Sequence, residues 1–166
     1  MPATIVIGVT VIHGIDIGEE NAGYKIVQAL EGTKLDLVII NAGVFKKETL
    51  DNPNFADELE MYKIVSVAPV FLAHHLYKAD LLSSPSKLIL VTTEGGSISL
   101  RTKEEGGGNY GHHGSKAAAN MVGKLLANDL YELGVTVAMI HVRFLARLLI
   151  SSLYLSVSCT DRFYED

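Results

Sequence analysis

Two side chains that can move or stabilise protons, His112 and Lys116, lie four residues apart in the second half of the chain. On a helix this spacing is about one turn, so both side chains project to the same side. Imidazole titrates near neutral pH, and an ammonium group one turn away disfavours a second positive charge beside it. We therefore interpret His112 as a general base and Lys116 as a group that polarises an oxygen. The alternative is a surface histidine without a role.

Polar side chains also follow two apolar runs that are typical of buried strands. Asn41 follows the first run, and Thr93 and Glu94 follow the second. In parallel α/β sheets, ligands bind at the carboxyl ends of the strands. Thr93 can orient a substrate oxygen there, or its hydroxyl can simply satisfy the strand end. Glu94 can bind substrate or pair with Lys116, or it can lie in solvent.

Two neighbours of His112 are further candidates for substrate binding. His113 lies three residues before Lys116 and can share its cleft. Tyr110 can line the mouth of the cleft or pack beneath the glycine-rich loop that precedes it. The adjacent pair His74 and His75 points in directions about 100° apart, which makes a poor chelating pair. We expect no metal site among the six histidines.

Strand and helix patterns alternate along the chain, and this alternation favours a parallel α/β sheet with helices on both faces. Strands are predicted over residues 4–12, 35–41, 87–93 and 136–142. Helices are predicted over residues 19–30, 54–82, 110–133 and 144–154. Asn52 or Asn54 is expected to cap the long helix, and Pro69 is expected to kink it. Residues 94–108 carry five glycines and are predicted to be a loop.

Composition and charge argue against several classes of protein function. The 166 residues suit one domain, and a net charge of −5 without a basic stripe argues against nucleic acid as a partner. The single cysteine, Cys159, fits a reducing compartment, and we find no secretion signal, so we expect a cytoplasmic protein. The apolar tract 135–157 is interrupted by His141, Arg143 and Arg147, so a strand followed by a helix is expected rather than a membrane span.

Three stretches in the right order and spacing resemble the short-chain dehydrogenase/reductase family, in the style of its fungal members. They are residues 35–43, which end in Asn-Ala-Gly, residues 87–97, and residues 109–121, which contain Ser-Lys-Ala-Ala-Ala-Asn-Met. The resemblance runs over about residues 15–141. It implies a Rossmann-like fold and hydride transfer between a nicotinamide cofactor and a carbonyl or alcohol. It also implies a catalytic tetrad of asparagine, serine, tyrosine and lysine.

The resemblance assigns a residue of this chain to each member of that tetrad. Lys116 takes the lysine position and Thr93 the serine position, which preserves a hydroxyl. His112 takes the tyrosine position, and Val65 takes the asparagine position. One position is therefore retained, one is conservatively changed, and two are chemically altered.

The part of the family that holds the cofactor is reduced in this sequence. Its first strand is followed by a glycine-rich turn and a helix that bind the pyrophosphate, whereas here Gly8 runs directly into Val9, so the N-terminal strand–helix–strand unit is expected to be shortened. Asp16 resembles the family's adenine contact, or it caps the helix that starts near Glu19. The residual cofactor-binding residues implied by the resemblance are Asn41, Ala42, Gly43, Asp16 and Lys116. Asn41 can instead hold neighbouring strands together.

Three functions follow. The first is acid–base chemistry without a bound cofactor (isomerisation, dehydration or cyclisation) on a small, largely apolar metabolite. The second is reduction of a carbonyl with NADP(H) or NAD(H) at an altered site. The third is a partner without catalysis, or an aberrant splice product, because residues 142–166 resemble nothing in the family. The resemblance also implies a homodimer, formed through the helices predicted at 54–82 and 110–133.

Overall fold

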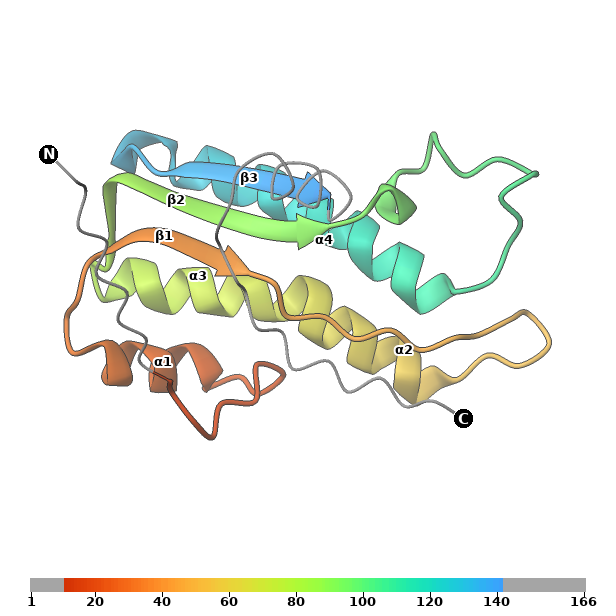
Figure 1. Ribbon diagram of the computed structural model, residues 1–166, viewed down its shortest axis with the longest axis horizontal. Helices are drawn as coiled ribbons and strands as arrows, with labels where there is room; N and C mark the ends of the chain where they lie inside the picture. The colour runs from red at the N-terminus through yellow and green to blue at the C-terminus, as the bar shows by residue number, and fades with distance from the viewer. Residues whose placement is uncertain (1–10, 142–166) are drawn as a thin grey trace, which may run out of the picture.

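Three parallel strands form the sheet of this protein, whose computed structural model describes residues 11–141. The strands are β1 (Leu35–Ile40), β2 (Leu82–Thr92) and β3 (Thr136–His141), and β2 lies in the middle (Figure 1). Leu88 is opposite Val38 of β1 on one side and Val137 of β3 on the other. The sequence predicted all three strands and their parallel arrangement, although β2 begins five residues earlier than expected.

The two faces of the sheet differ in exposure, because successive side chains of a strand point to opposite faces. In β2, Leu88 is 0% exposed and Leu90 is 2% exposed, because both point toward the helices. In β1, Leu37 and Ile39 point the other way and are exposed. The predicted N-terminal strand lies outside the described residues except for Val11 and Ile12. These two residues are in no strand, because β1 pairs only with β2 within the described chain.

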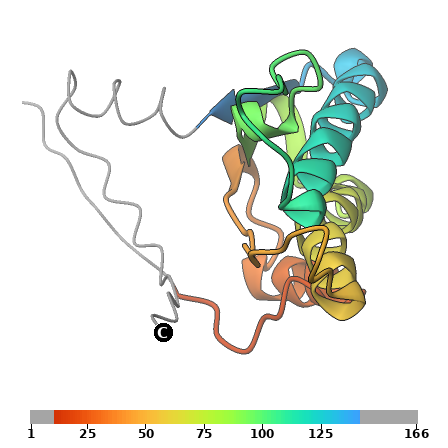
Figure 2. The same ribbon diagram turned by 90° about the vertical axis from the view of Figure 1, so that its right-hand side faces the viewer.

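The four longer helices are α1 (Ala22–Leu30), α2 (Phe55–Tyr62), α3 (Ala68–Lys78) and α4 (Tyr110–Asp129). Figure 2 shows that these helices lie on one side of the sheet. The alternation of strands and helices predicted helices on both faces, whereas the described helices cover one face, and the helix predicted over 144–154 lies outside the described residues. Two short helical turns, η2 (Glu94–Gly96) and η3 (Tyr131–Leu133), follow β2 and α4.

The long helix predicted over 54–82 is interrupted by a π-helical turn, η1 (Lys63–Val67), between α2 and α3. Asn54 caps its start, since its side-chain oxygen accepts hydrogen bonds from Ala56 N at 3.0 Å and Asp57 N at 3.2 Å. A kink at Pro69 was expected, and the irregularity instead precedes it. Proline has no N–H to donate to the carbonyl four residues earlier, and the wide turn accommodates that loss. The helix ends at Lys78 rather than at residue 82.

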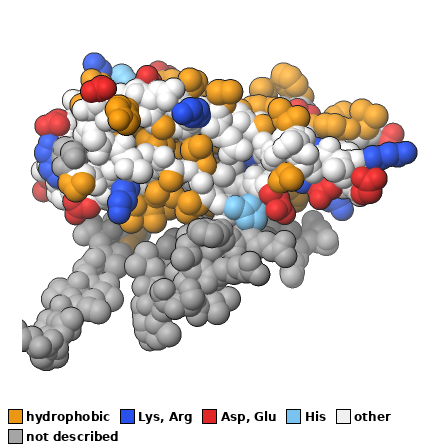
Figure 3. Space-filling model, turned by 90° about the horizontal axis from the view of Figure 1, so that it is seen from above, with side chains coloured by type: hydrophobic (Ala, Val, Ile, Leu, Met, Phe, Trp, Pro, Cys, Tyr) orange, Lys and Arg blue, Asp and Glu red, His pale blue; other side chains and the backbone are white. Residues whose placement is uncertain are grey.

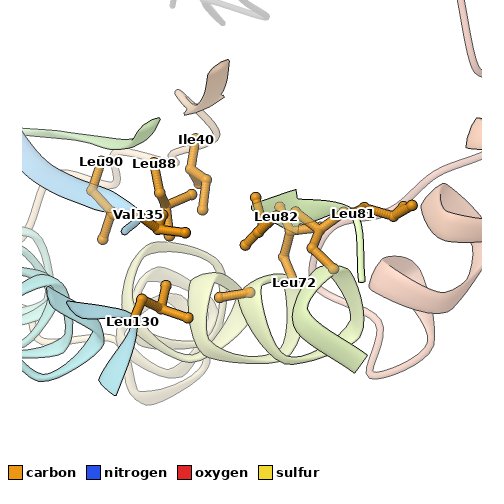
Figure 4. Close-up of a cluster of buried hydrophobic side chains, with 10 residues drawn as sticks. Ile40, Leu72, Leu81, Leu82, Leu88, Leu90, Leu130 and Val135 are labelled. Carbon is orange, nitrogen blue, oxygen red and sulfur yellow. The ribbon is translucent and has the colours of Figure 1, made fainter. Parts of the chain in front are cut away.

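The hydrophobic core lies between the sheet and the helices (Figure 4). Leu72 and Leu76 of α3 meet Leu88 and Leu90 of β2 there. The buried members of this cluster are Ile40, Leu72, Ala73, Leu76, Leu81, Leu82, Leu88, Leu90, Leu130 and Val135. Burial of each large side chain contributes about 1.5–3 kcal/mol, so this cluster fixes the helices against the strands.

Small residues let α4 approach its neighbours closely. A Cβ atom at Gly111 would collide with the Met61 side chain, and one at Gly114 would collide with the Tyr62 hydroxyl. The helix predicted over 110–133 is confirmed as far as Asp129, and Gly134 ends the following turn with a φ of 68°. Close packing on α2 therefore fixes the register of α4.

The surface is mixed in character. On the face shown in Figure 3, Lys and Arg side chains are scattered among acidic and hydrophobic ones without a continuous basic stripe. Within residues 11–141, no helix is long and apolar enough to cross a membrane.

Candidate active site

The candidate site lies at the carboxyl edge of the sheet, where three segments meet. They are the loop after β1, the loop after β2 and the first turns of α4, and Figure 1 shows all three at the same end of the molecule. This is the edge at which parallel α/β sheets bind ligands. The predicted location of the site agrees with this arrangement.

Lys116 connects the end of β2 with the Asn-Ala-Gly loop. Its Nζ donates a hydrogen bond to Val91 O at 3.0 Å. A Cβ atom at Gly43 would lie 3.8 Å from the same Nζ, so the ammonium group lies beside the backbone of that loop. Burial lowers the pKa of Lys116. The structure therefore brings together Lys116 and Gly43, two of the residues that the resemblance assigned to cofactor binding.

His112 lies one helical turn before Lys116, under an aromatic ring. The Phe45 ring meets the His112 ring edge-on, with centroids 5.0 Å apart and an angle of 85° between planes. Burial lowers the pKa of His112, and the charges of His113 and Lys116 lower it further. Its buried Nδ1 has no hydrogen-bond partner among the described residues. The neutral imidazole that the sequence predicted is therefore favoured, although burial contributes more than Lys116 does.

His113 and Thr93 both lie against Gly95. A Cβ atom at Gly95 would lie 2.7 Å from His113 Nδ1 and 3.3 Å from Thr93 Cγ2. Thr93 Oγ1 accepts a hydrogen bond from Gly95 N at 3.3 Å, so it caps η2, and its own hydroxyl proton can still be donated. The Thr93 hydroxyl therefore has a hydrogen-bond donor at the strand end and can still donate a hydrogen bond to a substrate oxygen.

Asn120, one turn beyond Lys116, is a residue of this site that our sequence reasoning missed. Thr92 Oγ1 donates to Asn120 Oδ1 at 2.8 Å, and Asn120 Nδ2 donates to Gly96 O at 3.4 Å. These two bonds hold the chain on both sides of Thr93. The available signal was the four-residue spacing from Lys116, which puts Asn120 on the same helix face.

Several predicted residues lie away from His112 or have other partners. Tyr110 is 42% exposed, and its hydroxyl lies 3.9 Å from where a Cβ of Gly107 would be, so it packs against the glycine-rich loop. Glu94 is exposed and forms no ion pair with Lys116. Asn41 and Ala42 are exposed. Val65, at the family's asparagine position, is buried in η1.

Asp16 does not cap α1, which was one of the two roles that the sequence left open for it. Its Oδ1 accepts from Gly18 N at 2.8 Å, and its carbonyl accepts from Glu19 N at 3.0 Å. Asp16 therefore caps a tight turn, and the helix starts only at Ala22. The reason is local, because the aspartate side chain reaches the N–H two residues on in preference to a helix end.

Glu48, in the loop after β1, is a second residue that sequence reasoning missed. It is 4% exposed, and its Oε1 accepts a hydrogen bond from Gly111 N at the start of α4. Its backbone carbonyl accepts from Asn109 N at 2.9 Å. No local pattern indicates these contacts, since the partners are about sixty residues apart in the chain.

An open cleft of about 660 Å³ lies elsewhere, between the start of α1 and the side of η1 and α3. It is lined by Gly18, Glu19, Glu20, Asn21, Tyr24, Lys63 and His75. None of the catalytic candidates contributes to it, so its size carries no argument about the chemistry at His112.

Comparison with curated proteins finds a bacterial relative, whereas no family model matches the chain. The relative is 1-hydroxy-2-glutathionyl-2-methyl-3-butene dehydrogenase from Rhodococcus sp. (strain AD45). It is 31% identical over 136 residues, which are 81% of this chain and 58% of the relative. The match therefore spans less than two thirds of the relative's length.

The fold is similar to that of solved dehydrogenases and reductases. NADPH-bound carbonyl reductase from chicken fatty liver matches with a TM-score of 0.68 and 24% identity, over 79% of this chain and 56% of that one. RhlG of Pseudomonas aeruginosa, solved with NADP, matches with a TM-score of 0.67 and 22% identity, over 76% and 50%. A short-chain dehydrogenase from Burkholderia cenocepacia in complex with NADP gives the same TM-score, identity and coverage. At these identities the likeness shows the fold.

Proposed function

This chain belongs to the short-chain dehydrogenase/reductase family of oxidoreductases, and from that premise we propose that it interconverts an alcohol and a carbonyl with His112 as the proton-moving group. The substrate class is a small, largely apolar metabolite, and the cofactor is NADP(H). The observation that carries the proposal is the pairing of His112 with Lys116 one turn away, at the edge where the Asn-Ala-Gly loop lies.

The residues support the following proton chemistry. A neutral His112 accepts the proton of the substrate hydroxyl, and the resulting imidazolium returns it when the reaction runs toward the alcohol. The Thr93 hydroxyl donates a hydrogen bond to the substrate oxygen, and the positive charge of Lys116 stabilises negative charge that develops there. The Phe45 ring contacts the His112 ring edge-on and shields that side of the imidazole from water.

The described residues fit one end of a nicotinamide cofactor. Lys116 would hold the ribose next to the nicotinamide, because its ammonium group already lies beside the bare backbone of Gly43. When bound, the cofactor accepts or supplies the hydride. The NADPH and NADP named in the neighbours' structures support NADP(H) over NAD(H). The family's glycine-rich pyrophosphate turn is reduced in this sequence, where Gly8 runs directly into Val9, and both residues lie outside the described range.

A second candidate is acid–base chemistry without hydride transfer, the reaction we first expected from the sequence. It is favoured by the replacement of both the tyrosine and the asparagine of the family, at His112 and Val65. Isomerisation, dehydration or cyclisation needs a base and no hydride donor. The relatives' names do not support it, since they describe dehydrogenases and reductases.

Cofactor binding separates these candidates, and the fluorescence of the reduced nicotinamide of NADPH, excited in its own absorption band, measures it. We expect saturable binding at micromolar NADPH, lost in Lys116→Ala and kept in His112→Ala. We expect His112→Ala to lower turnover by about 10²- to 10⁴-fold, the usual contribution of a general base. Turnover without NADPH binding at millimolar concentration would contradict the reductase and favour the second candidate. If the protein shows neither NADPH binding nor turnover, the remaining candidate is a partner protein without catalysis.

We also propose that two copies associate through the helices, as the family resemblance implies. The outer sides of α2, η1 and α3 expose Leu59, Tyr62, Val67, Val70, Phe71 and Tyr77. On α4, Met121 and Leu125 are exposed. An apolar surface of this kind is typical of an interface between subunits.

A further inference from the structure

Glu48 is a buried carboxylate with no cationic partner among the described residues. It is 4% exposed, and none of the ion pairs in residues 11–141 involves it. Burying a charge is costly unless it is paired or hydrogen-bonded. Its compensation is the start of α4, where Gly111 N donates to Oε1 and the helix dipole favours a negative charge.

Glu48 caps the start of α4 in place of Asn109, the residue that precedes the helix. Asn109, which precedes α4, has a φ of 51° and makes no side-chain cap. Its side-chain oxygen instead accepts from Glu48 N at 3.5 Å, and its N–H donates to Glu48 O at 2.9 Å. The start of α4 is therefore tied at Asn109 and at Gly111 to a loop far away in sequence.

Both segments tied by Glu48 contact the catalytic imidazole. His112 directly follows Gly111 in α4, and Phe45, whose ring lies on His112, is three residues before Glu48. The chain enters α4 through Gly106, Gly107 and Gly108, which resist bending less than other residues do. A fixed first turn therefore depends on contacts from outside this segment.

We propose that Glu48 is a positioning residue, which caps the first turn of α4 and so holds His112 in its buried place against Phe45. The positioning of His112 by Glu48 can be tested without measuring turnover. Its importance for catalysis rests on the proposed role of His112. Glu58 of α2 also faces this carboxylate, and burial together with the charge of Glu48 raises the pKa of Glu58.

The direction in which the pKa of His112 shifts when Glu48 is replaced distinguishes a positioning role from a purely electrostatic one. Removing the negative charge of Glu48 would by itself lower the pKa of His112, because the imidazolium would lose a favourable neighbour. Loosening the first turn would raise that pKa toward its ordinary value of about 6.5, because the ring would become hydrated. The two effects oppose each other, so the direction of the shift reports which one dominates.

The experiment follows the histidine ring signals by NMR across pH in the full chain, with His112 assigned by its loss in His112→Ala. We expect the His112 pKa to rise in Glu48→Ala and in Glu48→Asp, whose shorter side chain does not reach Gly111. We expect no rise in Glu48→Gln, which keeps an oxygen acceptor, or in Glu60→Ala, which removes an exposed glutamate of α2.

An unchanged or lowered His112 pKa in a folded Glu48→Ala or Glu48→Asp variant would overturn the proposal, as would a rise in Glu48→Gln equal to that in Glu48→Ala. If Glu48→Ala does not fold by circular dichroism, Glu48→Asp decides. Turnover is measured beside the titration. Unchanged turnover in His112→Ala would remove the proposed function and leave the positioning result standing, so the two failures are distinguishable.

Discussion

The chemistry proposed for this protein depends on the charge of one imidazole. Burial lowers the pKa of His112, and His113 and Lys116 add to the effect. A lowered pKa keeps the ring neutral at pH 7, which is the form that accepts a proton. The same burial means that the folded protein binds fewer protons at this ring than the unfolded chain does. The contribution of His112 to stability is therefore lost as the pH falls below about 6.5.

The first residue-scale consequence is the pH dependence of activity. We expect kcat/KM for oxidation of the alcohol to stay level down to pH values below about 6.5 and then to fall as His112 becomes protonated. In His112→Tyr, which places the family's residue there, we expect the acidic decline to begin at higher pH, because a phenol has an ordinary pKa near 10. An identical acidic limb in the two proteins would show that another group titrates.

At the residue scale, family resemblance predicted more of the site than local patterns did. His112, Lys116 and Thr93 were identified by their positions in family motifs, and the structure places them near the same loops. Glu48 was not identified, because its role depends on a partner in a distant segment. Asn120 was missed although its four-residue spacing from Lys116 indicated the same helix face. Whether a polar side chain caps a helix sixty residues away is decided by tertiary packing, which no local spacing encodes.

At the scale of elements, the distance between η2 and α4 is set by a single glycine. A Cβ atom at Gly96 would lie 2.7 Å from Lys116 C and 2.9 Å from Ala117 N. Both are backbone atoms of a helix interior, so neither can turn aside as a flexible side chain would. The loop that carries Thr93 can approach Lys116 only because position 96 has no side chain.

We therefore expect Gly96→Ala to lower the free energy of unfolding by about 1–3 kcal/mol, the usual cost of overpacking, and to reduce turnover. Urea unfolding measures the first effect. Gly107→Ala is the matched control, because the nearest side-chain atom to a Cβ there is 3.9 Å away. Equal stability of the two variants would show that α4 and η2 are free to separate.

The elements themselves followed largely from periodicity. The apolar runs predicted β1 and β3, and the helical periodicity predicted α4. The wide turn at η1 was not predicted, because a π-helical turn leaves the residue types of a helix unchanged. The late start of α1 was missed for a similar reason, since Asp16 caps turns and helices equally well.

At the scale of the whole molecule, the exposed apolar side chains of the helices favour association. Leu125 is 53% exposed on α4, and Phe71 is 39% exposed on α3. We expect sedimentation to show a dimer and Leu125→Glu to shift it to a monomer, because a charge would be buried at the contact. Ile98→Glu, in the loop after β2, is the control at an 85% exposed position. A mass unaffected by Leu125→Glu would exclude α4 from the interface.

The wide turn at residues 63–67 also constrains how this protein can vary in length. It contains one residue more than a regular helical turn, so α3 is rotated by about 100° from where an unbroken continuation of α2 would place it. Loss of a single amino acid there would remove this offset, so the resulting unbroken helix would keep Leu72 and Leu76 on the core side. In this segment a one-residue deletion is therefore compatible with the packing of α3, whereas a one-residue insertion would rotate Leu72 and Leu76 away from the core.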